Sequence, residues 1–142
     1  YELLDKTYDC DLIDKCIDDK KEYLNVKTNC LIKNRDIKKL SAFLKTKSSD
    51  EIESICDILL YGISMDIYDY DLLSKFKSCK SSLDAGKILF KKGKYSEVIY
   101  LLSPGASDEE YLLLSASYEM LGDLNKSKEY LDKVKNKDKL SK

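Results

Sequence analysis

The side chains that most often perform chemistry in proteins are absent from this sequence or wrongly spaced for it. The chain of 142 residues contains no histidine, so it lacks the commonest general base and the commonest metal ligand. Its five glycines are scattered and form no phosphate-binding loop. An acidic run near the N-terminus lacks the glycine and closing glutamate of an EF-hand loop, and we interpret it as a solvated helix face. That run comprises Asp9, Asp11, Asp14, Asp18 and Asp19. The sequence predicts no enzymatic activity, no cofactor and no metal.

The cysteines give a second indication of chemistry and of compartment. They are odd in number, irregularly spaced and without a CxxC pair. We therefore expect reduced, mostly buried thiols in an intracellular protein, cytoplasmic or nuclear. On that basis the sequon Asn125-Lys126-Ser127 is interpreted as accidental, because N-glycosylation requires a secreted chain. The cysteines are Cys10, Cys16, Cys30, Cys56 and Cys79.

Charge and hydropathy exclude two classes of partner. The chain has 25 basic and 26 acidic residues, a net charge of −1, which gives no global attraction to nucleic acid or anionic lipid. Lysines gather at residues 87–94 and 133–142, but with one arginine and no tryptophan we expect no nucleic-acid partner. The longest nearly apolar run, residues 58–65, is far shorter than the ~20 residues of a membrane span, so we expect no membrane partner. Because the chain begins with Tyr1, we expect it to be part of a longer protein.

The elements that must position any site are helices. One proline and five glycines are too few for an all-β chain, and apolar residues recur at helical spacing in stripes over residues 12–17, 23–32, 37–44 and 52–63. Ser49-Asp50 offers an N-cap before the last of these stripes. Residues 65–71 alternate as a strand does, but with no second strand to pair with we predict a loop leading into a short helix. The sequence therefore predicts short antiparallel helices stacked as hairpins.

Two units in the second half of the chain repeat one pattern. Each has a small residue midway through a first helix, a glycine-centred turn, an apolar residue just after the turn, and a small or β-branched residue three positions later. The residues in these roles are Gly86, Gly93, Tyr95 and Val98 in one unit and Ser115, Gly122, Leu124 and Ser127 in the other. Self-similarity on this scale is typical of a helical repeat array.

These units resemble the tetratricopeptide repeat, a helix–turn–helix of about 34 residues. The resemblance implies an all-α solenoid, with degenerate hairpins in residues 1–80, two repeats in residues 81–137 and a polar tail over 138–142. The glycines of the two turns are 29 positions apart, from Gly93 to Gly122, so the intervening second helix should end near Ser103-Pro104-Gly105. Such compressed units also resemble the N-terminal regions of scaffold subunits of the anaphase-promoting complex.

The resemblance implies a non-catalytic protein–protein interaction or scaffold module that binds a partner peptide or helix on a concave surface. An acid-bearing amphipathic segment would suit this surface, and the alternatives are a self-associating scaffold or, from another class, an enzyme or nucleotide-binding helical domain. The first helices of the two units would line the surface with Lys80, Leu83, Lys87, Phe90, Lys91, Glu109, Leu112, Leu113, Ala116, Glu119 and Met120.

Overall fold

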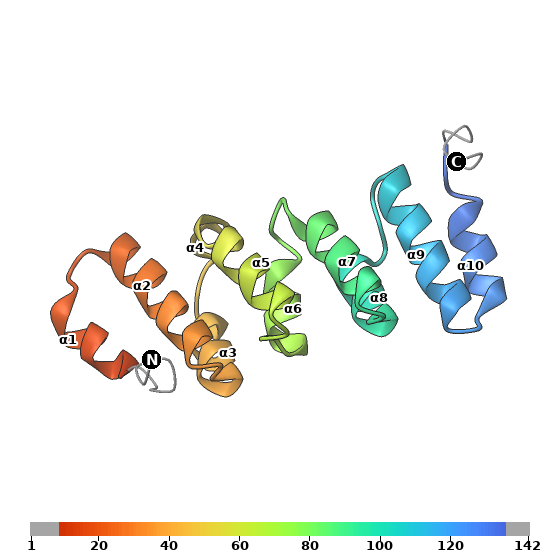
Figure 1. The fold of residues 1–142 in the computed structure, drawn as a ribbon. Helices are drawn as coiled ribbons and strands as arrows, with labels where there is room; N and C mark the ends of the chain where they lie inside the picture. Colours follow the sequence, from red (N-terminus) through yellow and green to blue (C-terminus); the bar gives the residue numbers. More distant parts are fainter. Residues whose placement is uncertain (1–8, 136–142) are drawn as a thin grey trace. The chain divides into compact units, whose positions relative to one another are not determined.

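The fold is a succession of short helices (Figure 1). A computed structural model describes residues 9–135, and none of these residues forms a β-strand, which confirms the expected all-α class. The predicted tail, residues 138–142, lies outside the described residues. The elements are η2 (Cys10–Leu12), α1 (Ile13–Cys16), α2 (Lys20–Lys33), α3 (Ile37–Lys45), α4 (Ser49–Ser54), α5 (Cys56–Ser64), α6 (Tyr70–Phe76), α7 (Ser82–Lys91), α8 (Tyr95–Leu102), α9 (Asp108–Met120) and α10 (Leu124–Leu131).

Most helices begin at an acidic or hydroxyl side chain that accepts a hydrogen bond from a backbone N–H of the first turn. Such caps satisfy donors that the helix itself leaves unpaired. At α4 the cap is reciprocal: Ser48 accepts from the Glu51 N–H and the Glu51 carboxylate accepts from the Ser48 N–H. The helix thus begins one residue earlier than Ser49-Asp50 suggests. The side-chain caps of the α-helices are Asp19, Asp36, Ser48, Asp69, Ser107 and Asp123.

One tight turn occurs at four places among the described residues. In each, a residue with positive φ follows a helix, at Arg35 (φ 55°), Asp66 (φ 64°), Gly93 (φ 79°) and Gly122 (φ 89°). In all four, the N–H of the next residue donates a hydrogen bond to the carbonyl oxygen five positions before it, with N···O distances of 2.8–3.1 Å. Because positions 35, 66, 93 and 122 are 31, 27 and 29 residues apart, the same turn recurs at nearly constant spacing.

The chain divides into two compact units, one ending at Lys80 and the other beginning at Ser81. In the first unit α2 packs against α3 and α5, and α3 packs against α6. Leu40, Leu44 and Phe76 are fully buried there. In the second unit α7 pairs with α8 and α9 with α10, and α9 also contacts both helices of the preceding pair. Leu89, Val98 and Leu114 form its core.

Small residues allow the two helices of each hairpin in the second unit to approach closely. A Cβ placed on Gly86 of α7 would lie 2.8 Å from the Leu102 Cδ1 of α8. At the corresponding position of α9, the Ser115 hydroxyl donates to the Ser127 carbonyl oxygen of α10 over 2.8 Å. Position 86 therefore leaves little room for any side chain, whereas position 115 holds a serine whose hydroxyl bonds across the hairpin.

The apolar stripe over residues 52–63 predicts one helix, but the structure divides it at Ile55. The Ser54 hydroxyl donates to the Glu51 carbonyl oxygen over 2.6 Å, which is the acceptor that a continuous helix would offer to the Ile55 N–H. Ile55 instead bonds to the Ile52 carbonyl. Competition of this kind is typical of serine inside a helix. The loop before α6 and the end of α8 at Leu102 agree with the sequence expectations.

Candidate functional site

An open groove in the second unit gathers side chains from α7 and α9. It has a volume of about 230 Å³. Phe90, Leu112 and Leu113 provide most of its apolar lining, and all three are only partly buried. All six lining residues belong to the concave set expected from the sequence: Lys87, Phe90, Glu109, Leu112, Leu113 and Ala116.

An ion pair joins the two helices at this groove. The Lys87 ammonium lies 3.3 Å from the Glu109 carboxylate, and each side chain is about half exposed (53% and 52%). Exposed pairs contribute little stability, about 0–1 kcal/mol, because water screens them. Either charge can therefore exchange its partner for a group on an incoming ligand at small cost.

The other expected site residues lie outside the groove lining. Leu83 is half-buried on α7, one turn before Lys87, and Lys91 is exposed one turn after it. On α9, Glu119 and Met120 are exposed near the C-terminus of the helix, with 58% of Met120 accessible. Lys80 is exposed in the first unit, in the turn before α7. The structure thus brings part of the set together in one cavity and leaves these five beyond it.

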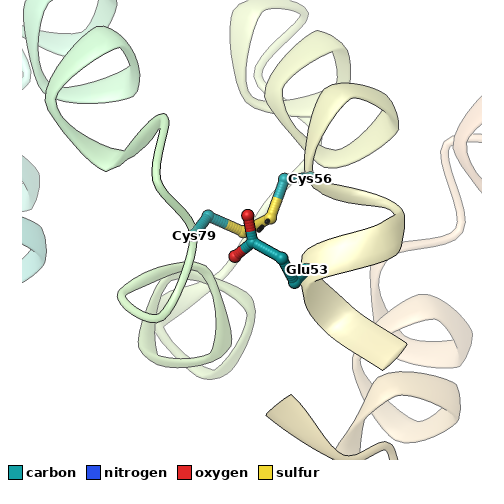
Figure 2. Close-up of side chains that lie close together, drawn as sticks. All are labelled: Glu53, Cys56 and Cys79. Carbon is teal, nitrogen blue, oxygen red and sulfur yellow. Dashed lines mark hydrogen bonds between the residues drawn. A yellow bond between two sulfur atoms is a disulfide. The ribbon is translucent and has the colours of Figure 1, made fainter. Parts of the chain in front are cut away.

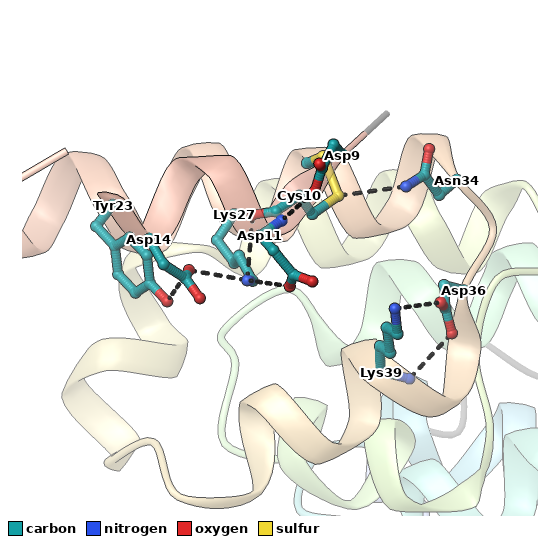
Figure 3. The surroundings of a disulfide bond; sticks show 10 residues. Asp9, Cys10, Asp11, Asp14, Tyr23, Lys27, Asn34, Asp36 and Lys39 are labelled. Carbon is teal, nitrogen blue, oxygen red and sulfur yellow. Dashed lines mark hydrogen bonds and ion pairs between the residues drawn. A yellow bond between two sulfur atoms is a disulfide. The ribbon is translucent and has the colours of Figure 1, made fainter. Parts of the chain in front are cut away.

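A second polar cluster lies in the first unit, around the buried Lys27 of α2 (Figure 3). The Lys27 ammonium donates to the Asp14 carboxylate over 2.9 Å and to the Cys10 carbonyl over 3.2 Å, and lies 3.7 Å from Asp11. The Tyr23 hydroxyl donates to the same Asp14 oxygen over 2.7 Å. The cluster ties η2 and α1 to α2. Sequence reasoning did not select Lys27, although its place between Leu24 and Leu31 on the apolar face of α2 is a visible signal.

The contacts within this cluster shift the pKa values of Asp14 and Tyr23. Hydrogen bonds from Lys27 and Tyr23 hold the pKa of Asp14 below its usual range. Burial, reinforced by the hydrogen bond to Asp14, raises the pKa of Tyr23 to about 12. The fold therefore favours an ionised Asp14 and a neutral Tyr23, the protonation states that these hydrogen bonds require near neutral pH.

Four carboxylates of the acidic run make contacts within the fold. Asp9 and Asp19 cap η2 and α2, and Asp11 and Asp14 pair with Lys27. Their carboxylates are exposed, as the interpretation of a solvated face predicts.

The expectation of reduced thiols is wrong for four of the five cysteines. Cys10 is disulfide-bonded to Cys30, and Cys56 to Cys79, whereas Cys16 is free and exposed. Irregular spacing and an odd count concealed the pairs, because partners 20 and 23 positions apart meet only when helices pack. Disulfides persist in oxidising compartments, so they do not favour the expected intracellular location.

Glu53 lies beside the second disulfide (Figure 2), with its carboxylate 3.9 Å from the Cys56 sulfur. Ligand atoms of Glu53, Cys56 and Cys79 all lie within 4.8 Å of one another. Metals bind cysteine as a thiolate, however, and both sulfurs are here committed to the disulfide. The oxidised pair therefore works as a cross-link between α5 and the turn that precedes α7.

Among residues 9–135, no helix is both long and apolar enough to cross a bilayer. Comparison of the chain with family models, with curated proteins and with solved structures gives no match.

Proposed function

We propose that this chain is a non-catalytic protein–protein interaction module, a tetratricopeptide-like solenoid of helical hairpins that binds an acid-bearing amphipathic segment in the groove between α7 and α9. The observation that carries the proposal is the convergence of Lys87, Phe90, Glu109 and three apolar side chains on one cavity. Four turns with the same hydrogen bonds support the repeat architecture.

The spacing of the groove residues suits a helical or extended ligand. Leu112, Ala116 and Met120 are four positions apart and follow one face of α9, while Leu83, Lys87 and Lys91 do the same on α7. Apolar anchors supply affinity at such surfaces, and rim charges orient the ligand. Lys91 makes no ion pair within the described part of the chain and is a ready site for a ligand carboxylate.

The test uses synthetic amphipathic peptides with apolar residues at helical spacing and either Glu or Lys at the flanking positions. Fluorescence anisotropy should show tighter binding of the Glu series. Phe90→Ala and Lys87→Glu should each weaken that binding by about tenfold, the equivalent of 1.4 kcal/mol.

Lys128→Glu is the matched control, because Lys128 is exposed on α10 and does not line the groove. Equal losses from all three variants, or none from any, would contradict the proposal. Equal affinity for the Glu and Lys series would contradict the assigned ligand charge. Sedimentation of the free protein distinguishes self-association, in which a second copy occupies the groove.

A further inference from the structure

The sequon Asn125-Lys126-Ser127 lies in an exposed part of the second unit. Asn125 is in the first turn of α10, just after the turn at Gly122, and all eight residues from 119 to 126 are exposed. The Asn125 amide makes no hydrogen bond within the described residues, and lysine at the middle position satisfies the acceptor motif, which excludes only proline there. The site is sterically open and chemically complete.

The disulfides indicate the compartment that N-glycosylation requires, which the acceptor motif alone does not indicate. N-glycosylation takes place in the secretory pathway, and two disulfides indicate folding in the same oxidising environment. Both are in the first unit and the sequon is in the second. The compartment is thus indicated by residues that have no part in the acceptor motif.

Exposed apolar side chains lie close to the acceptor in the sequence. Leu121 and Leu124 are 50% and 66% accessible, and Leu124 is adjacent to Asn125. Two large exposed apolar residues at one hairpin tip favour association when nothing covers them. A glycan is bulky and solubilising, so one attached at Asn125 would shield them.

We propose that Asn125 carries an N-linked glycan. In the reaction, the Asn125 Nδ2 forms a bond to the anomeric carbon of an oligosaccharide carried on a polyprenyl diphosphate. The bond from that carbon to the diphosphate oxygen breaks, the polyprenyl diphosphate leaves with the electron pair, and the amide loses one proton to a base of the transferase. None of the groove-lining residues belongs to α10, so the glycan would be attached outside the groove lining.

The test begins with the full chain directed into the secretory pathway of eukaryotic cells. The wild type should migrate as a slower band, in both cell extract and medium, which peptide N-glycosidase converts to the mobility of Asn125→Gln. In heavy-oxygen water the enzyme should leave a labelled aspartate at position 125. Only Cys16 should react with a thiol reagent in the unreduced, denatured protein.

Three variants act as controls. Ser127→Thr keeps the acceptor motif and should keep the glycan, Ser127→Ala should lose it, and Asn29→Gln, at an exposed asparagine outside any sequon, should have no effect. Asn125→Gln should also aggregate at lower concentration than the glycosylated wild type.

The native protein provides the decisive arm. Mass spectrometry of the protein isolated from its own cells should find Asn125 modified. An unmodified Asn125 in that protein, an unmodified Asn125 in secreted and disulfide-bonded chains, or five reactive thiols would each overturn the proposal. None of these outcomes bears on the groove, which uses other residues.

Discussion

Among the charged side chains of residues 9–135, Lys27 alone is buried, with 7% of the residue exposed. Its ammonium contacts two carboxylates and a backbone carbonyl, so the residue joins α2 to the segment before it. The two carboxylates remain partly in water, with Asp11 and Asp14 side chains 80% and 47% exposed. Removal of the Lys27 ammonium should therefore cost less than it would with fully buried carboxylates, because water can solvate the two carboxylates.

Replacing Lys27 with methionine, which keeps the apolar stem, should lower the free energy of unfolding by about 1.5–3 kcal/mol, the range for hydrogen bonds to a charged group. Lys38→Met on α3 is the control, because Lys38 is exposed and should change stability by less than about 0.5 kcal/mol. Urea unfolding with the disulfides intact measures both. Equal effects would mean that the Lys27 contacts contribute nothing specific.

The raised pKa of Tyr23 predicts that the stabilisation from the same cluster is lost at alkaline pH. In the folded chain its pKa is raised to about 12 from 10.0, so the unfolded chain loses this proton first as pH rises. The stabilisation is complete below pH ~10 and is lost as pH rises through ~12. Stability of the wild type measured against Tyr23→Phe should fall over this interval. A constant difference between the two proteins would contradict the raised pKa of Tyr23 in the folded chain.

Several elements could be predicted from the sequence because their signals are local. Apolar spacing predicted the helices, and Gly93 and Gly122 predicted two turns. Arg35 and Asp66 adopt the same backbone geometry without the glycine that marks it, so only the hydrogen bonds reveal those copies. Six of the eleven residues expected from the resemblance line the groove, and five lie outside it. The disulfides and the buried Lys27 were not predicted, because each depends on contacts between residues distant in sequence.

The turn glycines allow a test at the scale of the hairpin. Apart from the glycine itself and its two chain neighbours, no atom lies within 4 Å of a Cβ built on Gly93 or Gly122, so substitution causes no steric clash with the rest of the protein. Gly93→Val and Gly122→Val should still destabilise the protein by about 1–2 kcal/mol, because positive φ strains a β-branched residue.

Asparagine tolerates positive φ better than valine does, so Gly93→Asn is the matched control and should cost clearly less. Thermal unfolding followed by circular dichroism measures the series. If valine and asparagine have the same effect, the left-handed turn is not what the glycines provide.

For the molecule as a whole, the distribution of cysteines makes the two units chemically different. All five cysteines precede residue 81, so both disulfides cross-link the first unit and neither touches the second. In the chain-entropy model, closing loops of 20 and 23 residues stabilises the folded state by about 3 kcal/mol per bond.

A reductant should therefore accelerate amide hydrogen exchange in residues 9–80 and leave residues 81–135 almost unchanged. The variant with Cys56→Ser and Cys79→Ser should show part of this faster exchange without reductant. Cys16→Ser, which removes the free thiol, should not change the exchange. Exchange is read by mass spectrometry on peptides from each unit. Equal acceleration in both units would mean that they unfold together, and protection unchanged by reduction would mean that packing alone holds the first unit.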